Sequence, residues 1–213
     1  MRNFHNIERT NVDKMINYQP NVGLMYLAYV VTVLIIKIFS GQKENFDLQE
    51  NFRKSFQTDK IILMVLISLE VILIFLIDFK NKFILGFNID TSSNLRNIGI
   101  VLGYLGTIFI ILSLIKLGKV YTATLNIMNG HKLVQNGIYK YIRHPIYTGF
   151  ILLHLGVTLA LSNLIVTFVW IGGLCIFLWH RVPKEEELLE YYFKDEYKLY
   201  KARTGMFFPK ILR

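Results

Sequence analysis

The chain has 213 residues, of which 53% are hydrophobic, and a formal net charge of +9. This length suits one domain of ordinary size, but the mean hydropathy of +0.40 is high for a water-soluble domain. The single cysteine, Cys175, excludes an intramolecular disulfide, and scattered histidines without ligand spacing exclude a thiolate metal site.

The apolar residues come in blocks rather than in a regular period. Lipid forces every backbone amide to bond within its own segment, so a block of about 18 or more apolar residues indicates a membrane-spanning helix. Sixteen helical residues rise about 24 Å, less than the roughly 30 Å hydrocarbon core, so the last two blocks indicate a tight hairpin. We therefore expect an all-α integral membrane bundle of about five transmembrane helices, at 22–39, 60–79, 97–116, 146–161 and 164–179.

Two parts of the chain follow from this reading. Residues 1–96 hold a polar lead-in and the first two spans, with a charged loop at 40–59 and a linker at 81–96. Residues 97–213 hold the other three spans and a polar tail. In the tail, Pro183 suits the first turn of a new amphipathic helix, which Gly205 closes.

The distribution of Lys and Arg sets the orientation. Alternating spans place 18 of the 24 basic residues on the face that carries the tail. The other face keeps six, which are Arg2, Arg9, Lys14, Lys80, Lys82 and Arg96. This bias predicts a cytoplasmic tail and an outside N-terminus. It also favours an anionic membrane leaflet over nucleic acid as the partner of the basic residues.

Two polar segments carry the residues with chemical potential. Segment 131–147 is a basic, aromatic stretch between two apolar blocks, and segment 181–187 begins where the last block ends. We expect them to meet at one membrane face and form a cofactor site. Arg143 near a helix N-terminus favours an anion, and Arg181 and Glu185 share a face on a continuous helix. The simpler alternative is an Arg-His pair in the headgroups and a snorkelling arginine.

Other polar residues in the spans give less specific signals. Glu70 lies in the middle of the second span, where an ionisable residue usually faces a cavity or a partner. His154 and His180 favour packing or interfacial roles. Gly99, Gly103 and Gly106 indicate close helix packing, with a groove for a lipid tail as the alternative.

The two segments resemble the isoprenylcysteine carboxyl methyltransferase family, in a superfamily that also contains phospholipid N-methyltransferases. The resemblance rests on His-Lys-Leu-Val at 131–134, Gly-Ile-Tyr at 137–139, Arg-His-Pro-Ile-Tyr at 143–147 and the tail from Arg181 to Leu189. It covers roughly 95–213, and the final Thr204-Gly205 and Phe208-Pro209-Lys210 look like the compact prokaryotic branch.

The resemblance implies an S-adenosylmethionine-dependent membrane enzyme, with its site on the cytoplasmic face of a prokaryotic cell membrane. It implies methyl esterification of the carboxylate of an isoprenylated cysteine that enters from the bilayer. Arg181 would hold that carboxylate, and Arg181 and Glu185 would be the catalytic pair. The residues implied for cofactor binding are His131, Lys132, Leu133, Val134, Tyr139, Arg143, His144, Pro145, Ile146 and Glu185.

Three alternatives stay open at this point. The first is N-methylation of a phospholipid amine or methylation of another small lipophilic acceptor, which would give Glu or His more weight as a proton acceptor. The second is a membrane sterol reductase, which carries a similar Arg-His-Pro stretch but binds NADPH and needs more spans. The third is a small membrane anchor without enzymatic activity.

Overall fold

The computed structural model describes Leu27 and residues 50–78, 82–118 and 132–210. The first expected span and His131 lie outside these residues, apart from Leu27. The described chain is helical, which confirms the all-α prediction. Its elements are α2 (Glu50–Asp78), α3 (Lys82–Leu85), α4 (Ser93–Leu117), the 3-10 turn η2 (Gly137–Lys140), α5 (Pro145–Leu161) and α6 (Leu164–Arg203).

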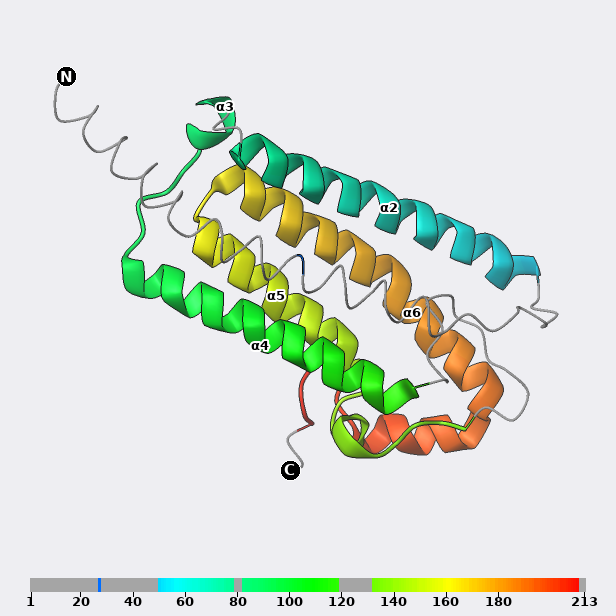
Figure 1. Cartoon of the computed structure of the whole chain (residues 1–213). Coiled ribbons are helices and arrows are strands. Elements are labelled where there is room, and N and C mark those ends of the chain that lie inside the picture. The colour runs from blue at the N-terminus through cyan, green and yellow to red at the C-terminus, as the bar shows by residue number, and fades with distance from the viewer. Residues whose placement is uncertain (1–26, 28–49, 79–81, 119–131, 211–213) are drawn as a thin grey trace, which may run out of the picture.

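The long helices lie along one another, and only the end of α6 departs from this direction (Figure 1). That last part crosses beneath the ends of α4 and α5, close to η2. By length and composition, α4 and α6 are candidate membrane spans, while 61–77 and α5 are shorter apolar helices. The bundle core contains Ile77 of α2, Ile110 of α4, Val157 of α5 and Trp170 of α6.

The helix boundaries show where apolar blocks predict structure well. α5 ends at Leu161, as expected, because Ser162 adopts the left-handed conformation and Asn163 caps the next helix. The prediction of a charged loop up to residue 59 is wrong for its last part, because α2 already begins at Glu50. α4 likewise begins at Ser93, capped by the Ser92 hydroxyl, which accepts from the Leu95 amide.

The prediction that a new helix begins at Pro183 is also wrong. α6 runs from Leu164 to Arg203 with Pro183 inside it, and the break in helical geometry falls at Lys194, whose φ is 45°. A proline removes one hydrogen bond to the residue four positions earlier. Here Val182, Glu186 and Leu188 are all buried, so packing on both sides of Pro183 keeps the helix continuous.

Glycines let α4 and α5 approach closely, which confirms the predicted packing role. A Cβ at Gly99 would lie 2.6 Å from the Ala160 nitrogen, and one at Gly106 would lie 2.5 Å from the Leu153 nitrogen. Gly156 of α5 faces the backbone of Gly103 in the same way. The helices therefore meet backbone to backbone, and along this seam the glycines pack against α5 rather than opening a lipid groove.

Substitution of Gly156 is expected to separate the two helices. Gly156→Ala would force a methyl group into the α4 backbone, and we expect a loss of about 1–3 kcal/mol in stability. The matched control is Gly172→Ala in α6, because a Cβ there meets nothing within 4 Å. Thermal unfolding in detergent should separate the variants, and equal melting temperatures would contradict close packing at Gly156.

Arg96, which charge counting placed on the outer face, is buried with 0% exposure. Its guanidinium donates to the carbonyl oxygens of Ala160 at 3.2 Å and Leu161 at 3.4 Å. These carbonyls end α5, where the helix dipole is negative, so the arginine is favourably placed there. Arg96 thus joins α4 to the end of α5 opposite the polar segments.

Candidate active site

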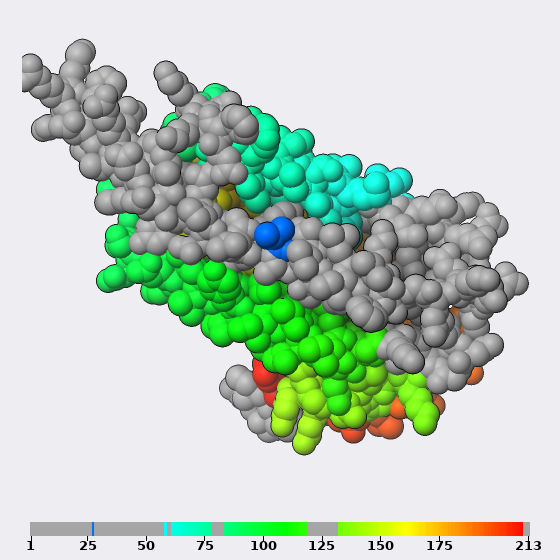
Figure 2. All heavy atoms as spheres, in the orientation of Figure 1, coloured from blue at the N-terminus to red at the C-terminus, as the bar shows by residue number. Residues whose placement is uncertain are grey.

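Segments 131–147 and 181–187 come together at one end of the bundle, which confirms that they meet. The His144 ring lies 3.1 Å from Glu186, through Nε2, and the Tyr147 hydroxyl donates to Glu185 over 2.5 Å. In the space-filling view, the described part of segment 131–147 and the tail gather at the same end of the molecule (Figure 2). Residues about forty positions apart therefore form one cluster.

A short backbone pairing holds the first segment in place. The amides of Arg143 and His144 donate to the carbonyls of Gly205 and Met206, at 2.8 and 3.0 Å. The Gly205 amide donates in turn to the Tyr141 carbonyl at 3.1 Å. A Cβ at Gly205 would overlap the Phe208 carbonyl oxygen, so this tail turn requires glycine.

Glu186 is the centre of the buried cluster. Its Oε1 accepts from Arg143 Nε at 2.8 Å and lies 3.1 Å from His144 Nε2, while Oε2 lies 2.9 Å from the Lys201 ammonium. Burial alone would raise the pKa of this carboxyl, but the hydrogen bonds from His144, Lys201 and Arg143 outweigh it and hold the pKa well below its ordinary value. Glu186 is therefore the anion that joins segment 131–147 to α6.

A second group forms around the Tyr147 hydroxyl. It accepts from Arg181 Nε at 3.3 Å and donates to Glu185, which also lies 3.7 Å from Arg181 Nε and 3.8 Å from His144 Nδ1. The Arg181 side chain is 10% exposed, so this arginine does not snorkel into solvent. The contact with Glu185 confirms the four-residue spacing on a continuous helix. The phenol thus lies between the two residues predicted to be catalytic.

The predicted cofactor residues differ in how deeply they are buried. Tyr139 and His144 are buried, and the Tyr139 carbonyl accepts from the Tyr200 hydroxyl at 2.7 Å. Lys132 is exposed at the start of the segment, with Leu133 and Val134 half-buried after it. Pro145 begins α5, and Ile146 packs against the bundle core. His131 lies outside the described residues.

Sequence reasoning missed three members of the cluster. Glu186 and Tyr147 enter the sequence analysis only as parts of the quoted motifs, and Lys201 does not enter it. The signal for Glu186 lies in its neighbours, because adjacent residues on a helix point about 100° apart. Glu185 and Glu186 therefore point in different directions, toward Tyr147 and toward Arg143 respectively, and each faces a different ring nitrogen of His144.

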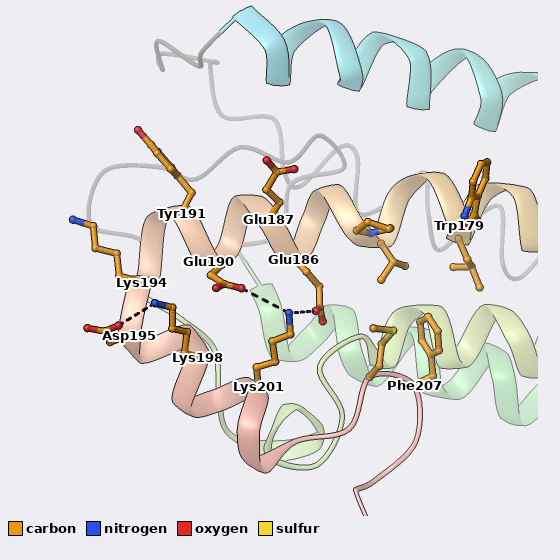
Figure 3. Close-up of a pocket in the computed structure, with 14 residues that line it drawn as sticks. Trp179, Glu186, Glu187, Glu190, Tyr191, Lys194, Asp195, Lys198, Lys201 and Phe207 are labelled. Carbon is orange, nitrogen blue, oxygen red and sulfur yellow. Dashed lines mark hydrogen bonds and ion pairs between the residues drawn. The ribbon is translucent and has the colours of Figure 1, made fainter.

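A cavity of about 1020 Å³ lies against the other side of the cluster. Its apolar part is formed by Leu178, Trp179, Val182 and Phe207, and its charged part includes Glu186, Glu190, Lys198 and Lys201. In the close-up, Lys201 points toward Glu186 and Glu190, while Glu187 and Tyr191 point away from it (Figure 3). The cavity reaches the cluster through Glu186, whereas Arg181 and Glu185 lie outside its wall.

The lowered pKa of Glu186 predicts acid sensitivity. An acid whose pKa is lower in the folded state stabilises the fold above its unfolded pKa of about 4.3, and this contribution disappears as the pH falls. We expect up to about 1.4 kcal/mol of stability to be lost per pH unit below about pH 4. Glu186→Gln should show a shallower acid loss in thermal unfolding, and parallel curves would contradict this assignment.

The fold and the cluster together define a helical protein of membrane type, with a buried charged site where its apolar helices end. Residues 98–191 match the model of the "Isoprenylcysteine carboxyl methyltransferase (ICMT) family". The predicted resemblance to this family is thereby confirmed. The matched region contains α5, segment 131–147 and segment 181–187, so it includes both halves of the cluster.

Curated relatives agree with this match. A "Probable protein-S-isoprenylcysteine O-methyltransferase" from Oryza sativa subsp. indica is 31% identical over 113 residues, which are 51% of this chain and 59% of the relative. The protein-S-isoprenylcysteine O-methyltransferase of Schizosaccharomyces pombe is 37% identical over 81 residues, or 38% of this chain and 34% of the relative. The aligned regions thus span less than two thirds of the length of these relatives.

A solved structure supports the fold. The eukaryotic intramembrane Ras methyltransferase ICMT superposes with a TM-score of 0.62, covering 94% of this chain and 68% of that chain. The two sequences are 19% identical, so this likeness concerns the fold.

Proposed function

We propose that this chain is an S-adenosylmethionine-dependent membrane methyltransferase that esterifies the C-terminal carboxylate of an isoprenylated cysteine. The observation that carries the proposal is the buried contact of Arg181 with Tyr147 and Glu185, in the middle of α6 where its apolar part ends. A guanidinium in this position suits a carboxylate on a lipid-borne acceptor. The names of the curated relatives point to the same acceptor.

The methyl donor is proposed to lie where the cavity borders the cluster, beside Glu186 and Lys201. Its cationic and hydroxyl groups suit the carboxylates of Glu185 and Glu186, and its own carboxylate suits the ammonium of Lys201. An aromatic surface for its base is present at Trp179 and Phe207. Two residues of the set implied by the resemblance, Arg143 and His144, contact Glu186, which lines this cavity. These residues therefore fit the donor's charges.

Methyl transfer to a carboxylate requires no proton transfer by the protein. A bound S-adenosylmethionine supplies an electrophilic methyl group, and a carboxylate is already ionised at neutral pH. The chain must align the carboxylate, exclude water and balance charge. Arg181 would align the carboxylate. The buried surroundings of His144 and Tyr147 lower the local dielectric, which strengthens each of these interactions.

The proposal includes a membrane arrangement. Five spans, the last two a tight hairpin, would place the site on the cytoplasmic face of a prokaryotic cell membrane. This is supported by the excess of Lys and Arg on one face and by the short Ser162-Asn163 connection between α5 and α6. The division into 1–96 and 97–213 agrees with a family match that starts at residue 98.

One assay tests the reaction. Purified protein is incubated with methyl-labelled S-adenosylmethionine and either a farnesylated cysteine analogue or a phospholipid amine. We expect a base-labile ester on the farnesylated cysteine. Label found only on the amine would overturn the proposed acceptor in favour of N-methylation, and no label on either would overturn the proposed reaction.

A further inference from the structure

The Tyr147 hydroxyl takes hydrogen bonds that Arg181 and Glu185 could otherwise make with each other. The two charged residues are four positions apart on α6, a spacing that favours a direct ion pair. Arg181 Nε nevertheless lies 3.7 Å from Glu185 Oε2, which is too far for a hydrogen bond. The phenol oxygen is closer to both, at 3.3 Å from Arg181 Nε and 2.5 Å from Glu185 Oε2. The ion pair is therefore loose, and the hydroxyl is bonded to both of its members.

Aromatic rings hold the phenol in this position. The ring of His144 stacks on that of Tyr147, with 5.5 Å between the centroids. The ring of Phe177, on α6, meets it edge-on at 6.2 Å, and the ring of Phe150, on α5, lies 6.3 Å away. Tyr147 is buried among these side chains from two helices. The place of its hydroxyl is therefore set by the fold and needs no bound ligand.

We propose that Tyr147 is a positioning residue that keeps the Arg181–Glu185 pair open, so that the guanidinium can take the carboxylate of the acceptor. This inference rests on the proposed function, which gives that carboxylate to Arg181. A guanidinium in close contact with one carboxylate has fewer N–H groups and less uncompensated charge for a second carboxylate. By bonding to both members, the phenol prevents that close contact.

Removing the hydroxyl should close the pair. Among the described residues, Tyr147 donates the one side-chain hydrogen bond that Glu185 receives, since His144 Nδ1 is 3.8 Å away. Tyr147→Phe takes this bond away and keeps the ring that packs against its neighbours. The Glu185 side chain is 23% exposed, and a mostly buried carboxylate is costly without a partner. The carboxylate should therefore turn to Arg181 Nε, its nearest cationic nitrogen.

Binding of the acceptor without a methyl donor tests this arrangement. The full chain in lipid nanodiscs is titrated with a farnesylated cysteine analogue that ends in a carboxylate and, separately, with its methyl ester. The ratio of the two affinities removes the contribution of partition into the bilayer. We expect Tyr147→Phe to lower this ratio roughly tenfold, the effect of one hydrogen bond to a charged group. Tyr141→Phe, which removes an exposed phenol, is the matched control and should leave the ratio unchanged.

A double substitution separates positioning from a purely structural role. Glu185→Gln removes the charge that would capture Arg181. It should therefore raise the carboxylate-to-ester ratio more in the Tyr147→Phe background than in the parent protein, and such a difference measures the coupling of the two residues. An equal effect in both backgrounds, or an unchanged ratio in Tyr147→Phe, would overturn the positioning role.

A spectroscopic measurement keeps this proposal distinct from the proposed reaction. Nitrogen NMR of arginine-labelled protein reports the Nε–H group of Arg181, with Arg181→Lys identifying the signal. We expect this signal to shift in Tyr147→Phe and to return toward its parent position when Glu185→Gln is added. An unmoved signal in Tyr147→Phe would overturn the open pair alone. A parent protein with no preference for the carboxylate over the ester would overturn the proposed acceptor and, with it, the purpose of the open pair.

Discussion

Arg181→Ala is expected to reduce carboxyl methylation by roughly 100-fold or more, because it removes the group that aligns the acceptor. The side chain is held by Tyr147 and Glu185, so its position is defined before any acceptor arrives. Binding of the methyl donor should change far less, since the predicted donor contacts are with other residues. Steady-state methylation of a farnesylated cysteine analogue, with donor affinity measured separately, checks both expectations.

Two variants control for loss of charge and of shape. Lys140→Ala removes an exposed positive charge near the cluster and should leave the rate unchanged. Arg181→Lys keeps the charge but loses the planar guanidinium, so an intermediate rate is expected. Undiminished ester formation by Arg181→Ala would show that the carboxylate is held elsewhere. If an amine acceptor were used instead, Arg181→Ala would spare the activity.

Glu186→Ala is expected to cause the largest loss of stability of any single substitution in the cluster, about 3–5 kcal/mol. It would leave Arg143 and Lys201 without the carboxylate that both of them contact, and Arg143 would remain mostly buried. The anchoring of segment 131–147 to α6 depends on the same carboxylate. Thermal unfolding should show the loss directly, and methylation should fall with it.

Glu187→Ala is the matched control for stability. Glu187 is the next residue on α6, is exposed, and points away from Lys201. Removing its carboxylate should change stability by less than about 0.5 kcal/mol, as is usual for surface positions. Similar melting temperatures for the two variants would mean that the buried contacts of Glu186 contribute nothing specific.

The apolar pattern predicts well where the helices lie. It predicts poorly which direction each side chain takes around the helix axis. α5 matches its block because Pro145 and Ser162 end the apolar run on both sides. The continuity of α6 through Pro183 depends on burial of Val182 and Glu186, which local sequence does not reveal. Without that continuity, the directions of Glu185, Glu186 and Glu187 around the axis cannot be assigned.

Partnerships between distant residues were the harder part of the site. A midspan Glu70 indicates a partner or a cavity, but His154 is 84 positions away and had no companion at ligand spacing. Arg181 and Glu185 were accessible to sequence reasoning because their four-residue spacing defines a shared helix face. Tyr147 belongs to another helix, so only the folded chain places its hydroxyl between them.

Calorimetric titration of the full chain with S-adenosylhomocysteine tests most directly whether the two polar segments hold a methyl donor. We predict saturable binding that is strongly weakened in Glu185→Ala, with no binding of NADPH. Binding of NADPH instead of S-adenosylhomocysteine, or an affinity for S-adenosylhomocysteine that Glu185→Ala leaves unchanged, would contradict the account.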